Sequence, residues 1–202
     1  VYLAGTGCTA EDDPEVQTVE VLLDLALQTV LCSVEAQIQA GARAIFIAEP
    51  AASSVYVSPR QLEAGSDIFE RYVIRLNRQV KARLDAAGVD LIFHCCGEVT
   101  DDMLRAFCSL RPVVLSLGSS RRLWEDARIV PEDIVLFGNL PTKHFYSDDL
   151  TCEAVARRTA ELHARMRATG HPFILGSECD VLSVPGYERA IRGKVETFLR
   201  CP

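Results

Sequence analysis

The sequence predicts an α/β fold of the (β/α)8 barrel type, with about six βα units present in the chain. Short apolar runs alternate with longer segments of helical spacing over all 202 residues. The runs are continuously apolar, which is typical of parallel strands that are buried on both faces. Several are followed directly by polar residues, and a barrel gathers such residues at the carboxyl ends of its strands.

The strands are expected at residues 1–4, 44–48, 90–94, 113–117, 134–137 and 173–175. Helices are expected at residues 14–40, 59–87, 101–110, 148–169 and 185–199, with a short helical turn at 120–127. Gly41, Gly88 and Gly170 follow helix ends, where glycine is common. This alternation predicts parallel strands with right-handed crossovers.

The first helix carries apolar residues at helical spacing, which predicts one buried stripe. The repeating pairs are Val21-Leu22, Leu25-Ala26, Thr29-Val30 and Ser33-Val34. Asp12 and Asp13 precede Pro14, and this order is typical of a helix start.

An open doubly wound sheet is the alternative to a barrel. The segment Ala4-Gly5-Thr6-Gly7 lacks the third glycine of a dinucleotide-binding turn. Six strands cannot close a barrel that needs eight. We therefore expect residues 1–202 to form one domain, the C-terminal portion of a longer barrel, whose strand at 1–4 pairs with residues outside this sequence. The alternative is a natural short form whose open edge is covered by a second copy of the chain.

The composition is that of an ordinary globular protein, with 49% hydrophobic and 24% charged residues. The formal net charge of −7 argues against non-specific nucleic-acid binding, which needs a basic surface. No apolar run approaches a membrane span and no signal peptide is visible, so we expect a cytoplasmic protein without membrane partners. Both a monomer and a homo-oligomer are compatible with the sequence.

The eight cysteines are scattered through predicted helices and strands. This spread favours reduced thiols in a reducing compartment over a disulfide framework. Cys32, Cys108 and Cys152 lie in helical stretches and are expected to fill the core.

The segment His94-Cys95-Cys96-Gly97 ends the apolar run Leu91-Ile92-Phe93. Because strand side chains alternate, His94 and Cys96 should point one way and Cys95 the other. Nitrogen and sulfur donors of this kind suit zinc, and Cys179, after a later strand, is the best candidate for a third ligand. Three ligands and an open position are typical of catalytic zinc. The alternatives are a core histidine with buried cysteines, or a redox pair formed by Cys95 and Cys96.

Several segments together resemble the uroporphyrinogen decarboxylase superfamily in order and spacing. They resemble most closely its zinc-dependent branch, the methylcobalamin:coenzyme M methyltransferases and related corrinoid-protein methyltransferases. The segments are Gly41 to Pro50, Ser58-Pro59, Ile92 to Gly97, Phe137-Gly138-Asn139-Leu140 and Ile174 to Asp180.

The resemblance implies zinc bound by His94, Cys96 and Cys179, with Glu49 able to approach the metal. It also implies a corrinoid, supplied as methylcobalamin or on a partner protein, and a small-molecule methyl acceptor or donor such as a thiol. Asn139 is a candidate for substrate binding or for capping a loop.

The chain departs from the family pattern at two places. Arg75-Leu76 stands where Pro-Tyr is usual, and Pro141-Thr142 stands where Asp-Pro is usual. The decarboxylases lack the His-x-Cys and late Cys ligands and have an arginine-rich N-terminal segment that is absent here. Porphyrinogen decarboxylation is therefore the second hypothesis for the function, and a noncatalytic barrel fragment is the third.

Overall fold

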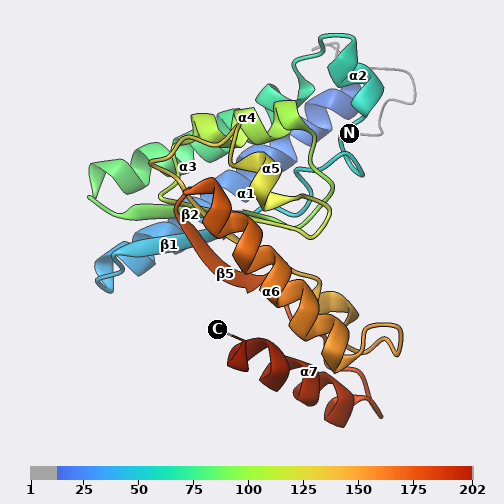
Figure 1. Cartoon of the computed structure of the whole chain (residues 1–202). Helices are drawn as coiled ribbons and strands as arrows, with labels where there is room; N and C mark the ends of the chain where they lie inside the picture. The colour runs from blue at the N-terminus through green and yellow to red at the C-terminus, as the bar shows by residue number, and fades with distance from the viewer. Residues whose placement is uncertain (1–12, 202) are drawn as a thin grey trace. The chain divides into compact units, whose positions relative to one another are not determined.

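The computed structural model describes residues 13–201, and within them five parallel strands alternate with helices (Figure 1). The predicted α/β fold class is therefore confirmed. The expected strand at residues 1–4 lies outside the described residues. The chain divides into two compact units, residues 1–113 and residues 114–202. The prediction of one domain over the whole chain stays a prediction.

The first unit holds strands β1 (Ala44–Ala48) and β2 (Asp90–Cys95), which pair in parallel with Ala48 opposite His94. Its helices are α1 (Pro14–Gln39), α2 (Pro59–Glu63), α3 (Arg75–Ala86) and α4 (Asp101–Ser109), and a π-helical turn, η2 (Glu70–Ile74), leads into α3. Phe93 of β2 packs against Phe107 of α4, with ring centroids 5.0 Å apart. The face of β2 that carries Phe93 is therefore the face that packs against α4.

The second unit holds β3 (Val114–Leu117), β4 (Val135–Leu140) and β5 (Phe173–Ser177), with β4 paired in parallel to both neighbours. The helical elements are α5 (Leu123–Asp126), the 3-10 turn η3 (Thr142–His144), α6 (Cys152–Thr169) and α7 (Glu188–Arg200). A small core of Phe145, Leu150, Val155 and Ile191 joins α6 to α7.

Local sequence signals set several helix ends. The Asp13 side chain accepts hydrogen bonds from the amides of Glu15 and Val16, and Thr100 and Thr151 cap α4 and α6 in the same way. Gly170 ends α6 in the left-handed conformation, at φ 72°. These ends lie within a few residues of the positions predicted from the sequence.

The helix expected over residues 59–87 is broken. Helix α2 ends before Gly65, which adopts a positive φ of 79° and donates its amide hydrogen to the Leu62 carbonyl. A left-handed residue ends the helical hydrogen-bond ladder, and the chain resumes helical structure only beyond residue 67.

The buried stripe predicted for α1 is wrong. The buried residues of α1 are Val16, Leu27 and Val34, whereas Leu22 and Leu25 are 58% and 64% exposed. Cys32, expected in the core, is also exposed. The apolar surface of α1 is wider than the part of the helix that is buried. The sequence pattern therefore identified an apolar surface, but it did not show which part of that surface the fold covers.

Helix α1 is also long and apolar enough, by length and composition, to cross a membrane. The sequence-based expectation missed this property because several uncharged polar residues interrupt the apolar ones. Core helices and signal sequences share these features, so this property by itself assigns no membrane location.

Candidate metal site

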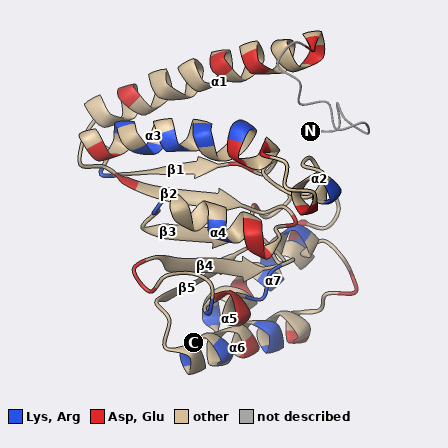
Figure 2. Ribbon diagram, turned by 90° about the horizontal axis from the view of Figure 1, so that it is seen from above, with Lys and Arg blue, Asp and Glu red and all other residues tan. Residues whose placement is uncertain are grey.

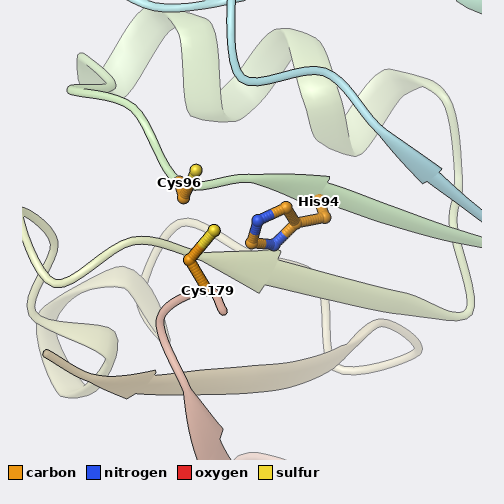
Figure 3. A group of neighbouring side chains, drawn as sticks. All are labelled: His94, Cys96 and Cys179. Atoms are coloured by element: carbon orange, nitrogen blue, oxygen red, sulfur yellow. The ribbon is translucent and has the colours of Figure 1, made fainter. Parts of the chain in front are cut away.

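The first half of the candidate metal site lies at the carboxyl end of β2 (Figure 3). His94 is buried, and its ring packs against Phe46 of β1 with centroids 5.5 Å apart. The ligand atoms of His94 and Cys96 lie within 4.8 Å of each other, a spacing at which both can approach one metal ion. The side-by-side arrangement expected from strand alternation is thus present.

The two neighbours of Cys96 have structural roles. Cys95 is fully buried, and its thiol donates to the Ala52 carbonyl oxygen at 3.4 Å. A Cβ added to Gly97 would lie 2.4 Å from the Ser53 Cβ and 3.0 Å from the Pro50 carbonyl oxygen. Only glycine therefore lets the loop after β1 pass this close to the end of β2.

Cys179 belongs to the second unit, where it follows β5. The backbone around it is fixed because the buried Thr142 hydroxyl donates to the carbonyl oxygens of Cys179 and Asp180, at 2.9 and 3.3 Å. Thr142 is one of the residues that depart from the family pattern, and here it positions the loop that bears the cysteine. That Cys179 completes a ligand set with His94 and Cys96 stays a prediction.

Glu178 is a buried carboxylate that the sequence reasoning missed. One oxygen accepts hydrogen bonds from the backbone amide and the hydroxyl of Ser119, at 3.0 and 2.5 Å. The other oxygen, Oε1, is buried without a hydrogen-bond partner among the described residues. The available signal was a glutamate three residues after the predicted strand at 173–175, a weaker form of the signal that drew attention to Glu49, which directly follows the predicted strand at 44–48.

Glu49 follows β1, and its backbone amide donates to the His94 carbonyl at 2.8 Å. Glu49 is the first residue after β1, whose last residue, Ala48, lies opposite His94. The carboxylate accepts a weak hydrogen bond from Asn77 of α3 at 3.4 Å. That Glu49 faces the same strand-end mouth as His94 stays a prediction.

The Glu49 carboxylate lines a cavity of ≈ 460 Å³ between α1, β1 and α3, together with Leu27, Phe46, Tyr72 and Asn77. Burial raises the pKa of Glu49 above its usual value, and the hydrogen bond from Asn77 opposes that effect. Glu49 therefore stays protonated to a higher pH than an exposed glutamate does, and only its ionised form is a good metal ligand.

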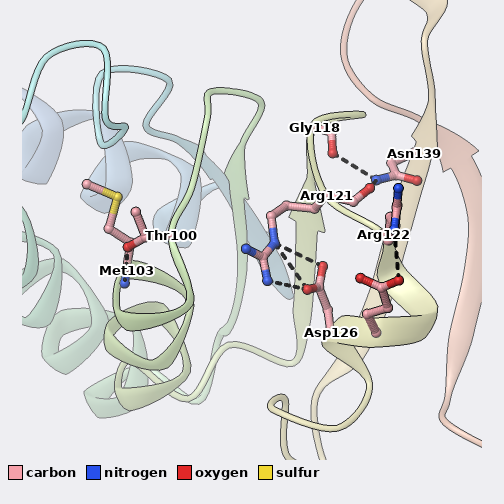
Figure 4. Close-up of polar contacts among 8 residues, drawn as sticks. Thr100, Met103, Gly118, Arg121, Arg122, Asp126 and Asn139 are labelled. Carbon is pink, nitrogen blue, oxygen red and sulfur yellow. Dashed lines mark hydrogen bonds and ion pairs between the residues drawn. The ribbon is translucent and has the colours of Figure 1, made fainter. Parts of the chain in front are cut away.

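Asn139, the candidate for substrate binding, is buried and holds a loop in place (Figure 4). Its side-chain amide donates to the carbonyl oxygens of Gly118 and Arg121, at 2.8 and 2.9 Å. Arg121 in turn makes a two-pronged ion pair with Asp126, which is 1% exposed. Two roles were predicted for Asn139, and these contacts fit the role of holding a loop. Its role in substrate binding stays a prediction.

The family model of uroporphyrinogen decarboxylase matches residues 13–185. The chain belongs to this family. A search of curated proteins found no match. Membership supports the predicted barrel type, because the parallel strands and alternating helices are consistent with an incomplete barrel of the uroporphyrinogen decarboxylase type. The family includes enzymes of more than one reaction type, so it does not by itself select the methyltransferase branch.

Glu49→Gln is expected to keep the zinc content of the protein. Glutamine has the size of glutamate and can still accept the Asn77 hydrogen bond, and Glu49 is not one of the three proposed zinc ligands. Zinc per chain, measured by elemental analysis after dialysis, should equal that of the wild type. Glu98→Gln, at an exposed position, is the control. Stoichiometric loss of zinc in Glu49→Gln alone would instead make Glu49 an essential ligand.

Proposed function

We propose that this chain is a zinc-dependent methyltransferase that moves a methyl group between a corrinoid and a small thiol. The observation that carries the proposal is the pair of His94 and Cys96, whose ligand atoms lie within 4.8 Å of each other at a strand end. Family membership supports it, because strand ends are where barrel enzymes keep their active sites.

The proposed zinc ligands are His94, Cys96 and Cys179. One imidazole and two thiolates match the donor preference of zinc, and the two negative charges balance the charge of the ion. When bound, zinc would hold an incoming thiol as a nucleophilic thiolate at neutral pH. Cys96 and Cys179 are each partly exposed, as a zinc site that takes up a small molecule requires.

The protein's own contribution is to hold the donors in place. A tilted ring contact with Phe46 restrains the His94 ring, and the Thr142 hydroxyl anchors the carbonyl of Cys179. Gly97 lets the chain turn immediately after Cys96. Such restraint lowers the entropy lost when substrate and nucleophile are aligned. The methyl chemistry itself belongs to the corrinoid, supplied by a partner protein or as free methylcobalamin.

Decarboxylation of a porphyrinogen is the alternative, and family membership alone accommodates it equally well. The thiol and imidazole donors favour methyl transfer, because decarboxylation has no evident use for a soft metal site. A chain without catalytic activity is the remaining alternative.

The test combines metal analysis with two activity assays on the same zinc-loaded preparation. We expect methylcobalamin to be consumed in the presence of coenzyme M or another small thiol, with the methylated thiol as product. Cys95→Ser should retain this activity and Cys96→Ser should lose it. Decarboxylation of uroporphyrinogen without methyl transfer would select the alternative, and a metal-free protein inactive in both assays would exclude the proposal.

A further inference from the structure

A second cavity lies in the second unit, between the carboxyl ends of β3 and β4 and helix α6. Its volume is ≈ 520 Å³, a size typical of small-molecule sites. Its lining comes from residues 119–162, so the cavity is formed within one unit of the chain. We call it the arginine cavity, because Arg121, Arg122 and Arg158 line it. The one carboxylate among its described lining residues is that of Glu161.

The charge of Arg121 is already balanced by a buried partner. Its Nε donates to both carboxylate oxygens of Asp126, at 3.1 and 3.3 Å, and Asp126 is 1% exposed (Figure 4). The amide of Asn139 also holds the backbone carbonyl of Arg121 in place. Arg121 therefore contributes to the wall of the cavity, and a ligand would have to be recognised by the other two arginines.

Arg122 and Arg158 are not balanced in this way. The pair of Arg122 with Glu125, at 3.1 Å, is 68% and 55% exposed and is weakened by water. Arg158 is exposed and makes no ion pair and no side-chain hydrogen bond with any described residue. Glu161 does not compensate, because its carboxylate accepts from Arg165 at 2.9 Å. Two guanidinium groups at the cavity are thus available to an anion.

The basic character of this part of the chain runs against that of the whole. The formal net charge of the chain is −7. Helix α6 nevertheless carries four arginines and two glutamates, and Figure 2 shows basic residues along it. A local excess of positive charge in an acidic protein raises the concentration of anions near that surface.

The arginine cavity also has apolar and aromatic walls. Leu140 and Leu162 are 2% and 5% exposed and form part of its lining. Trp124 lies beside them, and the Arg165 guanidinium lies over its ring at 4.7 Å from the centroid. Because Glu161 holds Arg165, the ring of Trp124 is restrained from that side. These walls suit a molecule that joins an anionic group to a compact apolar or aromatic part.

We infer that the arginine cavity binds a small-molecule phosphate monoester. The planar guanidinium group of arginine matches the oxygens of phosphate and can donate to them in pairs. A phosphate monoester carries close to two negative charges at neutral pH, so one ligand balances both Arg122 and Arg158. A carboxylate or a sulfate ester would balance only one of them. This inference goes beyond the proposed function and does not depend on it, because Cys179, the proposed zinc ligand of this unit, does not line the cavity.

The test uses Trp124, the single tryptophan of the chain, as its reporter. Phenyl phosphate and phenyl sulfate have nearly the same shape and differ in charge, and each is titrated into the full chain at neutral pH and constant ionic strength. We expect phenyl phosphate to change the tryptophan fluorescence with a dissociation constant below about 1 mM. Phenyl sulfate should bind at least about 10-fold more weakly. Calorimetry repeats both titrations, so binding that leaves the fluorescence unchanged is still detected.

Two variants on the same helix locate the site. Arg158→Gln should raise the dissociation constant for phenyl phosphate at least about 10-fold, because a charged donor to the phosphate is lost. Arg157→Gln is the matched control, since Arg157 is the exposed neighbour on α6 and does not line the cavity. Circular dichroism checks that both variants are folded.

Four results would overturn the inference. The first is the absence of phenyl phosphate binding by calorimetry, and the second is equal affinity for phenyl phosphate and phenyl sulfate. The third is an equal effect of Arg157→Gln and Arg158→Gln, which would indicate general attraction to a basic helix. The fourth is inorganic phosphate that binds as tightly as phenyl phosphate, which would show a site for the free ion and not for an ester.

Discussion

Cys96→Ser and Cys179→Ser are each expected to lose most of the zinc bound by the wild-type protein. A serine hydroxyl is a much weaker zinc ligand than a thiolate, and only two other protein ligands would remain in the proposed set. The measurement is zinc per chain after dialysis against a moderate chelator, with circular dichroism to confirm that each variant is folded.

Cys95→Ser is the matched control for this result. It changes the same atom in the adjacent residue, but the Cys95 thiol is buried against the Ala52 carbonyl and its serine replacement can still donate that hydrogen bond. Zinc should therefore be retained. Loss of zinc in Cys95→Ser with retention in Cys96→Ser would mean that the wrong face of β2 has been assigned to the metal. Retention in Cys179→Ser would remove that residue from the ligand set.

Asp126→Ala is expected to lower the free energy of unfolding by about 3 kcal/mol, because it leaves the partly buried Arg121 guanidinium without its anion. Asp126 is 1% exposed, and its two carboxylate oxygens both accept from Arg121. Arg121 also follows β3 in the loop that Asn139 braces, so its release should loosen this loop. Urea unfolding followed by circular dichroism gives the measurement.

The neighbouring pair of Arg122 and Glu125 supplies the control. This pair is well exposed, at 68% and 55%, and water screens it. Glu125→Ala should change the free energy of unfolding by no more than about 0.5 kcal/mol. Equal effects of the two substitutions would show that the Arg121–Asp126 pair contributes no more than a surface pair.

The elements of the fold were largely predictable because their signals are local. The strands over residues 44–48 and 90–95 each contain a short apolar run, and caps such as Thr100 and Thr151 mark helix starts. The break before α3 was missed because a single glycine is tolerated inside a helix, whereas here the amides of Gly65 and Ser66 end α2 by donating to the Leu62 and Gln61 carbonyls.

Side-chain pairing within one strand was also predictable. Alternation placed His94 and Cys96 on one face of β2 and Cys95 on the other, because the period of a strand is fixed by its backbone. The roles of Glu49 and Asn139 were not predictable in this way. Glu49 follows β1 and is hydrogen-bonded to Asn77, whereas Asn139 lies near the end of β4 and is hydrogen-bonded to the Gly118 carbonyl. Both partners come from distant parts of the chain.

The sequence by itself determined that this protein is a parallel α/β chain of the uroporphyrinogen decarboxylase family, with a nitrogen and sulfur donor pair at a strand end. Local periodicity and motif order carry that information. Only the tertiary structure decided which apolar residues of α1 are covered, that Glu178 is buried with one unpartnered oxygen, and that Thr142 holds the Cys179 loop. These features depend on which distant segments of the chain contact one another. An apolar helix surface or a carboxylate at a strand end could pack against several different partners, and only the tertiary fold selects one.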